Sequence, residues 1–337
     1  MDFDFSDDQL ALRDGARELL DGFAAPDRVR AHTAGGTAFD GALWDAMVEQ
    51  GWLGVEVPEA AGGIGLGTVE VAILAEELGA HAAPAPFVAQ ILAIDAFAAA
   101  GHDAWRDRLL EGVAHACVAW DLAHPVAYAP SADVAVVCEP DGVAAYELAS
   151  PPPREPAMDL TRELGWLDVE GLPRIALGDS AERTRLFDRG ATFTAADLLG
   201  SATRALTLAV EYAKERVQFG RPIGSFQAVK HRCADMLVDV EGMRSTVYWA
   251  AWCIGAGDRD ASVAASTAKT WCSDASKRVM ASALQVHGGI GFTWEHDLHF
   301  FLKRAQLDQL QFGDAAYHRA RLTELLRPRV EAGESVV

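Results

Sequence analysis

The stretch Arg216-Val-Gln-Phe-Gly-Arg-Pro-Ile-Gly-Ser-Phe-Gln-Ala-Val-Lys-His231 decides how the carboxy-terminal half of this chain folds. A helical pattern ends at Arg216, a turn rich in glycine and proline follows, and a second helical pattern begins near Phe226. This layout suits a phosphate group, because a guanidinium fork matches paired phosphate oxygens. A second glycine-rich break, Gln285-Val-His287-Gly-Gly289-Ile-Gly291-Phe, separates two later helical stretches.

Composition sets limits on what the chain can bind. The 337 residues are 50% hydrophobic, which is enough for a large core, and the formal net charge is −20. Such a charge argues against a nucleic-acid partner, so an anionic ligand must meet a local basic pocket. The five cysteines form no pair or cluster with metal-ligand spacing, and no metal site is expected. With no signal-peptide pattern and no long apolar run, the sequence predicts a cytoplasmic protein that does not enter a membrane.

Three zones of different composition predict a mainly α protein with a small β domain. Residues 1–113 form a first, helical zone, with helical periodicity at about 40–50, 68–79 and 85–100 and a glycine-rich loop at 51–65 between two helices. Residues 114–188 contain short β-prone runs at 132–138 and 143–148, and the turn sequence between them predicts a hairpin. Residues 189–337 return to long helical patterns and predict a carboxy-terminal four-helix bundle.

The helices of the last zone are amphipathic. The apolar residues of the second one recur at helical spacing and predict a buried face, made of Phe226, Val229, Cys233, Met236, Leu237, Val240, Met243, Val247 and Ala250. Residues 262–286 and 314–330 are expected to form two more helices.

This order of domains, together with the two glycine-rich motifs, resembles the acyl-CoA dehydrogenase family. The resemblance extends over the whole chain: the segments 44–54 and 57–65 look like the family's first domain, and 216–236 and 285–292 look like its carboxy-terminal domain. It implies the fold of that family, with an amino-terminal helical domain, a reduced middle β domain and the bundle. It also implies the cofactor FAD, an acyl-CoA substrate and an electron-transfer flavoprotein as electron acceptor.

In this family FAD lies across a subunit interface, and its ADP half is held by the bundle of the neighbouring subunit. By resemblance, Arg216 would neutralise the pyrophosphate, with Gln218 and Phe219 beside it. The other cofactor-binding residues implied are those of the glycine turn near the ADP ribose, Gln285, Gly288 and Gly289. Taken singly, the arginine also fits a solvated cation near a helix end, and the glycines fit a helix cap.

The family's catalytic base is absent from both of its usual places. The base is a carboxylate that removes the acyl α-proton while a hydride leaves the β-carbon for flavin N5, giving a trans-2-enoyl-CoA. The position of the common glutamate holds Phe312, and the alternative position falls at Gly190. Asp314, two residues beyond Phe312, is a weak candidate for the base, because it is displaced from the position of the family's glutamate and its side chain is one methylene shorter. It equally suits the cap of the last helix.

The middle domain also lacks convincing counterparts of the loop and strand that hold the flavin ring in the family. These departures resemble the short subunit of heteromeric (α2β2) actinobacterial acyl-CoA dehydrogenases of steroid side-chain degradation, in which a longer partner supplies the ring pocket and the base. Two alternatives stay open at this point. One is a self-sufficient homo-oligomer that uses Asp314, and the other is an acyl-CoA-binding or scaffold subunit without flavin. The residues do not identify the acyl group.

Overall fold

The computed structural model describes residues 4–36 and 39–335, and its amino-terminal part is helical. Ser6 begins the first helix with a capping box, because its hydroxyl accepts from the Gln9 backbone N–H and the Gln9 side chain accepts from the Ser6 N–H. Among the described residues, six α-helices come before the sheet: α1 (Asp7–Phe23), α2 (Pro26–Gly35), α3 (Gly41–Glu49), α4 (Thr68–Ala80), α5 (Phe87–Ala99) and α6 (Asp103–Leu110). None of the helices in the described ranges combines the length and apolar character needed to cross a bilayer.

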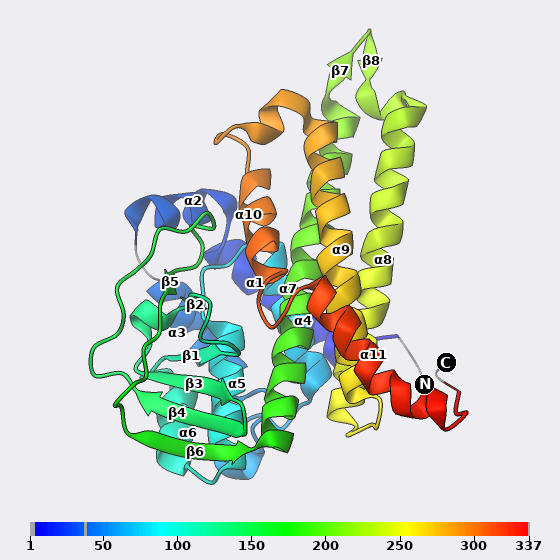
Figure 1. Cartoon of the computed structure of the whole chain (residues 1–337). Coiled ribbons are helices and arrows are strands. Elements are labelled where there is room, and N and C mark those ends of the chain that lie inside the picture. The colour runs from blue at the N-terminus through cyan, green and yellow to red at the C-terminus, as the bar shows by residue number, and fades with distance from the viewer. Residues whose placement is uncertain (1–3, 37–38, 336–337) are drawn as a thin grey trace.

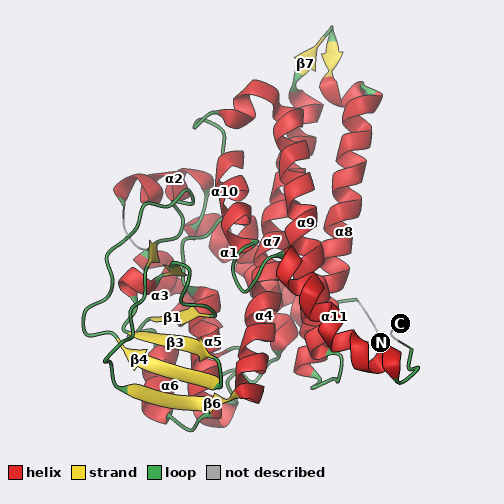
Figure 2. Cartoon of the chain, viewed as in Figure 1, coloured by secondary structure: helices red, strands yellow, loops and turns green. Residues whose placement is uncertain are grey.

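The middle of the chain forms a small sheet (Figure 2). Its strands run in the order β1 (Ala116–Ala119), β3 (Val134–Glu139), β4 (Gly142–Glu147) and β6 (Arg174–Asp179). The predicted hairpin is confirmed, since β3 and β4 pair antiparallel from Val134 opposite Glu147 to Glu139 opposite Gly142. A second, two-stranded sheet joins β2 (Val126–Ala127) to β5 (Leu164–Gly165).

The carboxy-terminal helices form a bundle of long helices next to this sheet (Figure 1). α7 (Ser180–Glu215), α8 (Gln227–Gly255) and α9 (Ala261–His287) pack on one another, α10 (Leu298–Asp308) packs on α7 and α9, and α11 (Ala315–Glu331) packs on α9. The mainly α fold with a small β domain is therefore confirmed. α7 begins directly after β6, inside the zone 114–188, and the domain limits at 113 and 188 stay a prediction.

The predicted buried face of α8 is right for its central residues and wrong for Leu237. Met236, Val240, Met243 and Val247 are buried, whereas the Leu237 side chain is 50% exposed. Each helical residue turns by about 100° from the one before it, so Leu237 cannot share the inward direction of Met236.

Two places in this fold bring together residues of the motifs. The first is the free end of the bundle, where the hairpin of β7 (Val217–Gln218) and β8 (Arg221–Pro222) and the 3₁₀ turn η5 (Gly288–Phe292) project beyond the long helices (Figure 1). The second is the junction of the bundle with the sheet, where α7 meets the turn between α10 and α11.

Candidate functional site

The hairpin at the free end of the bundle carries three of the predicted cofactor residues. Arg216 is the C-cap of α7 and leaves the helix with extended backbone (φ −69°, ψ 116°). Phe219 and Gly220 form the tip with positive φ values of 53° and 78°, which gives the hairpin its tight two-residue turn. Arg216, Gln218 and Phe219 are all exposed, and the Phe219 side chain is 92% exposed.

The end of α9 carries the other three predicted residues. Gln285 is exposed on the last turn of the helix, and Gly288 closes it with φ 63° and ψ −140°, a conformation that favours glycine. Apart from the neighbouring residues of the chain, no atom lies within 4 Å of the place where a Cβ would be on Gly288 or Gly289, so the backbone is open to a ligand. The Tyr212 ring of α7 stacks on the His287 ring at 4.8 Å between centroids, which fixes the two segments to the same end of the bundle.

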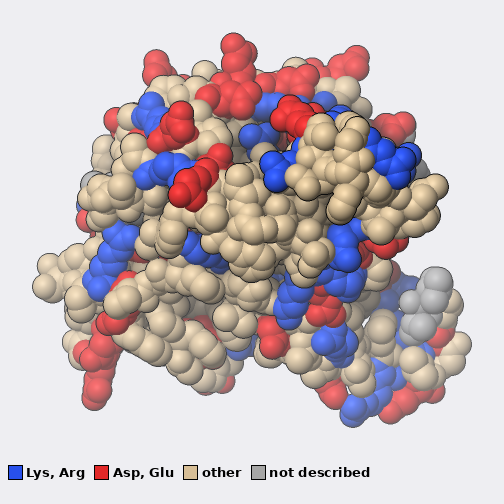
Figure 3. All heavy atoms as spheres, turned by 90° about the horizontal axis from the view of Figure 1, so that it is seen from above, with Lys and Arg blue, Asp and Glu red and all other residues tan. Residues whose placement is uncertain are grey.

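Positive charge gathers at this end of an otherwise acidic chain. Arg216, Arg221, Lys230 and Arg232 are exposed, and in the described part of the chain none of them lies within ion-pair distance of a carboxylate. Figure 3 looks onto this end and shows a broad area without charged side chains, with basic and acidic groups around it. Unpaired cations and an open glycine backbone fit the ADP half of FAD.

The two positions at which the family places its base touch each other. A Cβ built on Gly190 would lie 2.2 Å from the Phe312 ring, so the aromatic ring takes the space that a side chain at position 190 would need. Phe312 is buried, and its ring also lies edge-on to Phe187 at 6.2 Å between centroids. The contact between Gly190 and the Phe312 ring thus places apolar atoms at both positions from which a catalytic carboxylate would have to reach a substrate.

Buried side chains hold the turn that carries Phe312. The turn is strained, because Phe312 has a positive φ of 53° and Gly313 follows at 86°. The Lys269 ammonium, fully buried on α9, donates to the Gln309 carbonyl at 3.0 Å and to the Gly313 carbonyl at 2.8 Å. The His318 Nε2 lies 2.8 Å from the Phe312 carbonyl oxygen. Burial lowers the pKa of His318 to about 3, so its neutral ring donates this bond.

Asp314, the weak candidate for a base, caps the last helix. Its carboxylate accepts from the Tyr317 backbone N–H at 2.8 Å at the start of α11, and the residue is exposed. This bond satisfies a free helical N–H, which is the usual task of an aspartate at this position.

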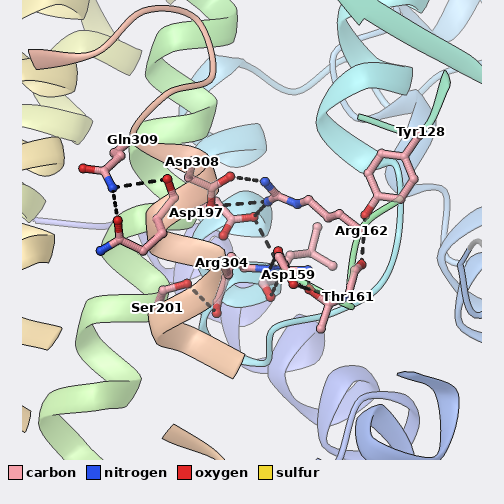
Figure 4. Close-up of polar contacts among 12 residues, drawn as sticks. Tyr128, Asp159, Thr161, Arg162, Asp197, Ser201, Arg304, Asp308 and Gln309 are labelled. Carbon is pink, nitrogen blue, oxygen red and sulfur yellow. Dashed lines mark hydrogen bonds and ion pairs between the residues drawn. The ribbon is translucent and has the colours of Figure 1, made fainter. Parts of the chain in front are cut away.

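The cavity beside Phe312 is too small for a flavin ring and an acyl group. Its volume is about 60 Å³, whereas small-molecule pockets commonly measure about 300–1,000 Å³. Arg162, from the loop after β4, reaches into this region and pairs with Asp308 of α10 and with Asp197 of α7, the latter at 2.8 Å (Figure 4). Burial raises the pKa of Asp308, and the adjacent Arg162 guanidinium acts in the opposite direction. The exposed residues at the free end of the bundle therefore fit the ADP half of FAD, whereas the cavity beside Phe312 does not fit its ring half.

Sequence reasoning missed this buried group of charges. Arg304 extends it by donating to the Ala83 carbonyl at 2.7 Å and to the Thr161 hydroxyl at 2.8 Å. The available signal was weak: Asp197 and Lys269 each interrupt an alanine-rich helical run at a position that periodicity turns inward.

Comparisons with known proteins agree with these features. Family models for the acyl-CoA dehydrogenase N-terminal and C-terminal domains match residues 6–116 and 181–326. The acyl-CoA dehydrogenase IpdE2 of Mycolicibacterium smegmatis is 35% identical over 89% of this chain and 93% of its own. The chain belongs to the acyl-CoA dehydrogenase family. The predicted family is thus confirmed, and with it the class of enzyme, a flavin-dependent oxidoreductase.

Two solved structures resemble this acyl-CoA dehydrogenase over nearly its full length. A chain of the ChsE4–ChsE5 complex from Mycobacterium tuberculosis has a TM-score of 0.86 and 27% identity, and covers 97% of this chain and 99% of that one. A chain of a Tcur3481–Tcur3483 steroid ACAD variant has a TM-score of 0.85 and 28% identity, with coverage of 96% and 99%.

Proposed function

We propose that this chain is the short subunit of a heteromeric, FAD-dependent acyl-CoA dehydrogenase. It would give the ADP-binding half of the flavin site to a longer partner, which supplies the ring pocket and the catalytic base. The observation that carries this proposal is the contact between Phe312 and Gly190, because it fills both base positions with apolar atoms. The exposed Arg216 and the open backbone at Gly289 support the retained ADP half.

The division of labour follows from the chemistry. Removal of an acyl α-proton needs an ionisable group held against the substrate in a dry pocket, and the partner would provide that carboxylate. Flavin supplies an acceptor for the β-hydride, so that the thioester leaves as trans-2-enoyl-CoA and two electrons pass on to an electron-transfer flavoprotein. The Arg216 guanidinium would hold the negative pyrophosphate, and the hairpin and η5 would exclude water from one side of it.

We further propose that the substrate carries a steroid-derived acyl group. The support is that one similar structure is a steroid ACAD and that the IpdE2 and ChsE4–ChsE5 proteins are similar to this chain along most of its length. A panel of acyl-CoA thioesters with steroid-derived, branched, aromatic and straight acyl groups tests this point. The proposal predicts the highest kcat/KM for the steroid-derived group, and equal or greater values for straight chains would contradict it.

Co-expression tests the heteromer. The chain is produced alone and with the product of a neighbouring long acyl-CoA dehydrogenase gene, and visible flavin absorbance and dye-coupled oxidation of acyl-CoA are recorded. We expect colourless, inactive protein from the chain alone and a yellow, active complex from the pair. Yellow, active protein from the single chain would indicate the self-sufficient enzyme, and a colourless complex would indicate a scaffold.

Arg216→Ala tests the retained half of the site within the complex. Loss of the guanidinium is expected to lower flavin occupancy at least tenfold at limiting FAD, since a charge-assisted bidentate contact contributes about 1.5–3 kcal/mol. Arg259→Ala is the matched control, because Arg259 is an exposed arginine in the loop at the opposite end of α8. Full flavin occupancy in the Arg216→Ala complex would show that the pyrophosphate lies elsewhere.

A further inference from the structure

A short segment after the glycine turn exposes aromatic side chains that the flavin residues do not account for. Phe292 is 75% exposed and Trp294 is 61% exposed. In the described part of the chain, Phe219 and Phe292 are the two most exposed large apolar side chains, and both lie at the free end of the bundle. Clustered apolar surface of this kind marks a contact with another molecule.

The segment is held in place by its own contacts. The Lys303 ammonium lies 3.6 Å from the centroid of the Trp294 ring, and the His299 ring meets the same indole at 4.7 Å between centroids. The Arg30 guanidinium of α2 donates to the Trp294 carbonyl and pairs with Asp297. A side chain fixed before binding loses little conformational entropy when a partner covers it, which favours binding.

Aromatic contacts also connect this segment to the flavin residues. The His296 ring lies 4.3 Å from the His287 ring between centroids, and His287 stacks on Tyr212, one turn before Arg216. A subunit that completes a cofactor site at Arg216 would therefore have to pass close to residues 292–294.

We propose that Phe292 and Trp294 form a docking site for the longer, catalytic acyl-CoA dehydrogenase subunit, separate from the residues that hold flavin. This inference rests on the proposed function. The partner surface would be an apolar depression that covers the two aromatic rings, with a carboxylate at its edge that pairs with Lys303. The carboxylate is expected because no carboxylate of the described chain lies within ion-pair distance of Lys303. That occupant is favoured by the similar chains of the ChsE4–ChsE5 complex and the Tcur3481–Tcur3483 protein, whose names each join two components.

The test measures subunit affinity and flavin content of the co-purified complex separately. Mass photometry over a dilution series gives the Kd between the subunits, and absorbance gives flavin per complex at limiting FAD. The variants are Phe292→Ser with Trp294→Ser, Lys303→Glu with both aromatic rings kept, and Arg216→Ala. The matched control is Val113→Ser with Val330→Ser, which removes two exposed apolar side chains far from this end.

We expect the aromatic double variant to raise the Kd at least tenfold and Lys303→Glu to raise it several-fold, with the control within twofold of the wild type. Arg216→Ala is expected to lose flavin and to change the Kd less than threefold. An unchanged Kd in the aromatic double variant would overturn the docking site while leaving the proposed function intact. Retained affinity with loss of flavin would overturn it too, by assigning the rings to the cofactor. If the wild-type chains form no complex, the proposed function itself fails.

Discussion

At the scale of single residues, the contact between Gly190 and Phe312 reverses an ordinary expectation. Alanine stabilises a helix interior by about 1 kcal/mol relative to glycine. At Gly190, however, the new methyl group would meet the Phe312 ring at 2.2 Å. We expect Gly190→Ala to lower the free energy of unfolding, since overpacking costs about 1–3 kcal/mol.

Urea unfolding checks this expectation, with Gly15→Ala as the control. Gly15 lies inside α1 with nothing within 4 Å of its Cβ position, so alanine there should stabilise the protein. In a Phe312→Ala background the cost of Gly190→Ala should disappear, because the ring is gone. If Gly190→Ala and Gly15→Ala changed the free energy of unfolding by the same amount, the close contact between Gly190 and Phe312 would be contradicted.

Lys269 predicts how stability depends on pH. Burial lowers its pKa from 10.5 in the unfolded chain to about 7 in the folded protein. Between these values the unfolded state holds the additional proton, so raising the pH favours folding, and below about pH 7 both states are protonated and the effect is constant. Relative to Lys269→Met, we expect the wild-type free energy of unfolding to rise by about 2 kcal/mol from pH 7 to pH 9. If the free energy of unfolding, measured in urea, changed with pH in the same way for the wild type and Lys269→Met, the lowered pKa of Lys269 would be refuted.

At the scale of elements, α11 depends on its cap. Asp314 accepts the Tyr317 N–H, and its loss should cost about 1 kcal/mol of unfolding free energy. Asp314→Ala is expected to show this cost, whereas Asp314→Asn should keep most of the stability, because asparagine caps helices nearly as well. The Asp314→Asn variant also distinguishes a helix cap from a catalytic base. If Asp314 only caps α11, the complex that carries Asp314→Asn keeps the wild-type kcat. A fall in kcat of a hundredfold or more would identify Asp314 as a catalytic carboxylate.

Helices and turns are also the scale at which prediction from sequence succeeded best. The hairpin with its turn at 139–142 and the helices expected at 262–286 and 314–330 are set by spacings and turn residues within a few positions of one another. Leu237 was misplaced because an apolar residue at the edge of a helical face satisfies the pattern without being buried.

At the scale of the whole molecule, Arg162 joins the β region to the bundle. Its guanidinium pairs with Asp308 and Asp197, and all three side chains are largely buried. Arg162→Met leaves both carboxylates without this partner, and we expect it to lower the free energy of unfolding by about 3 kcal/mol or more.

The double variant Arg162→Met with Asp308→Leu should be markedly less destabilised, because a buried pair can often be replaced by apolar groups without loss. Asp197 is expected to keep Arg304 as a partner in that protein, because the Arg304 guanidinium lies 3.7 Å from the Asp197 carboxylate in the wild-type chain. Urea unfolding of both variants measures the difference. A double variant as unstable as the single one would mean that the ion pair is not what holds the loop in place.

The sequence by itself determined the helices, the hairpin, the family motifs and the lack of a carboxylate at positions 190 and 312, because each depends on local spacing or on residue type. Only the tertiary structure decided that Phe312 fills the space over Gly190, that Arg162 lines the small cavity beside it, and that Phe292 and Trp294 stay exposed. Space filling and burial depend on which distant residues meet, and a local pattern carries no information about that. The stretch from Arg216 to His231 was therefore recognisable in the chain, but its exposure at the free end of the bundle, at the far end of α7 from the contact between Gly190 and Phe312, was not.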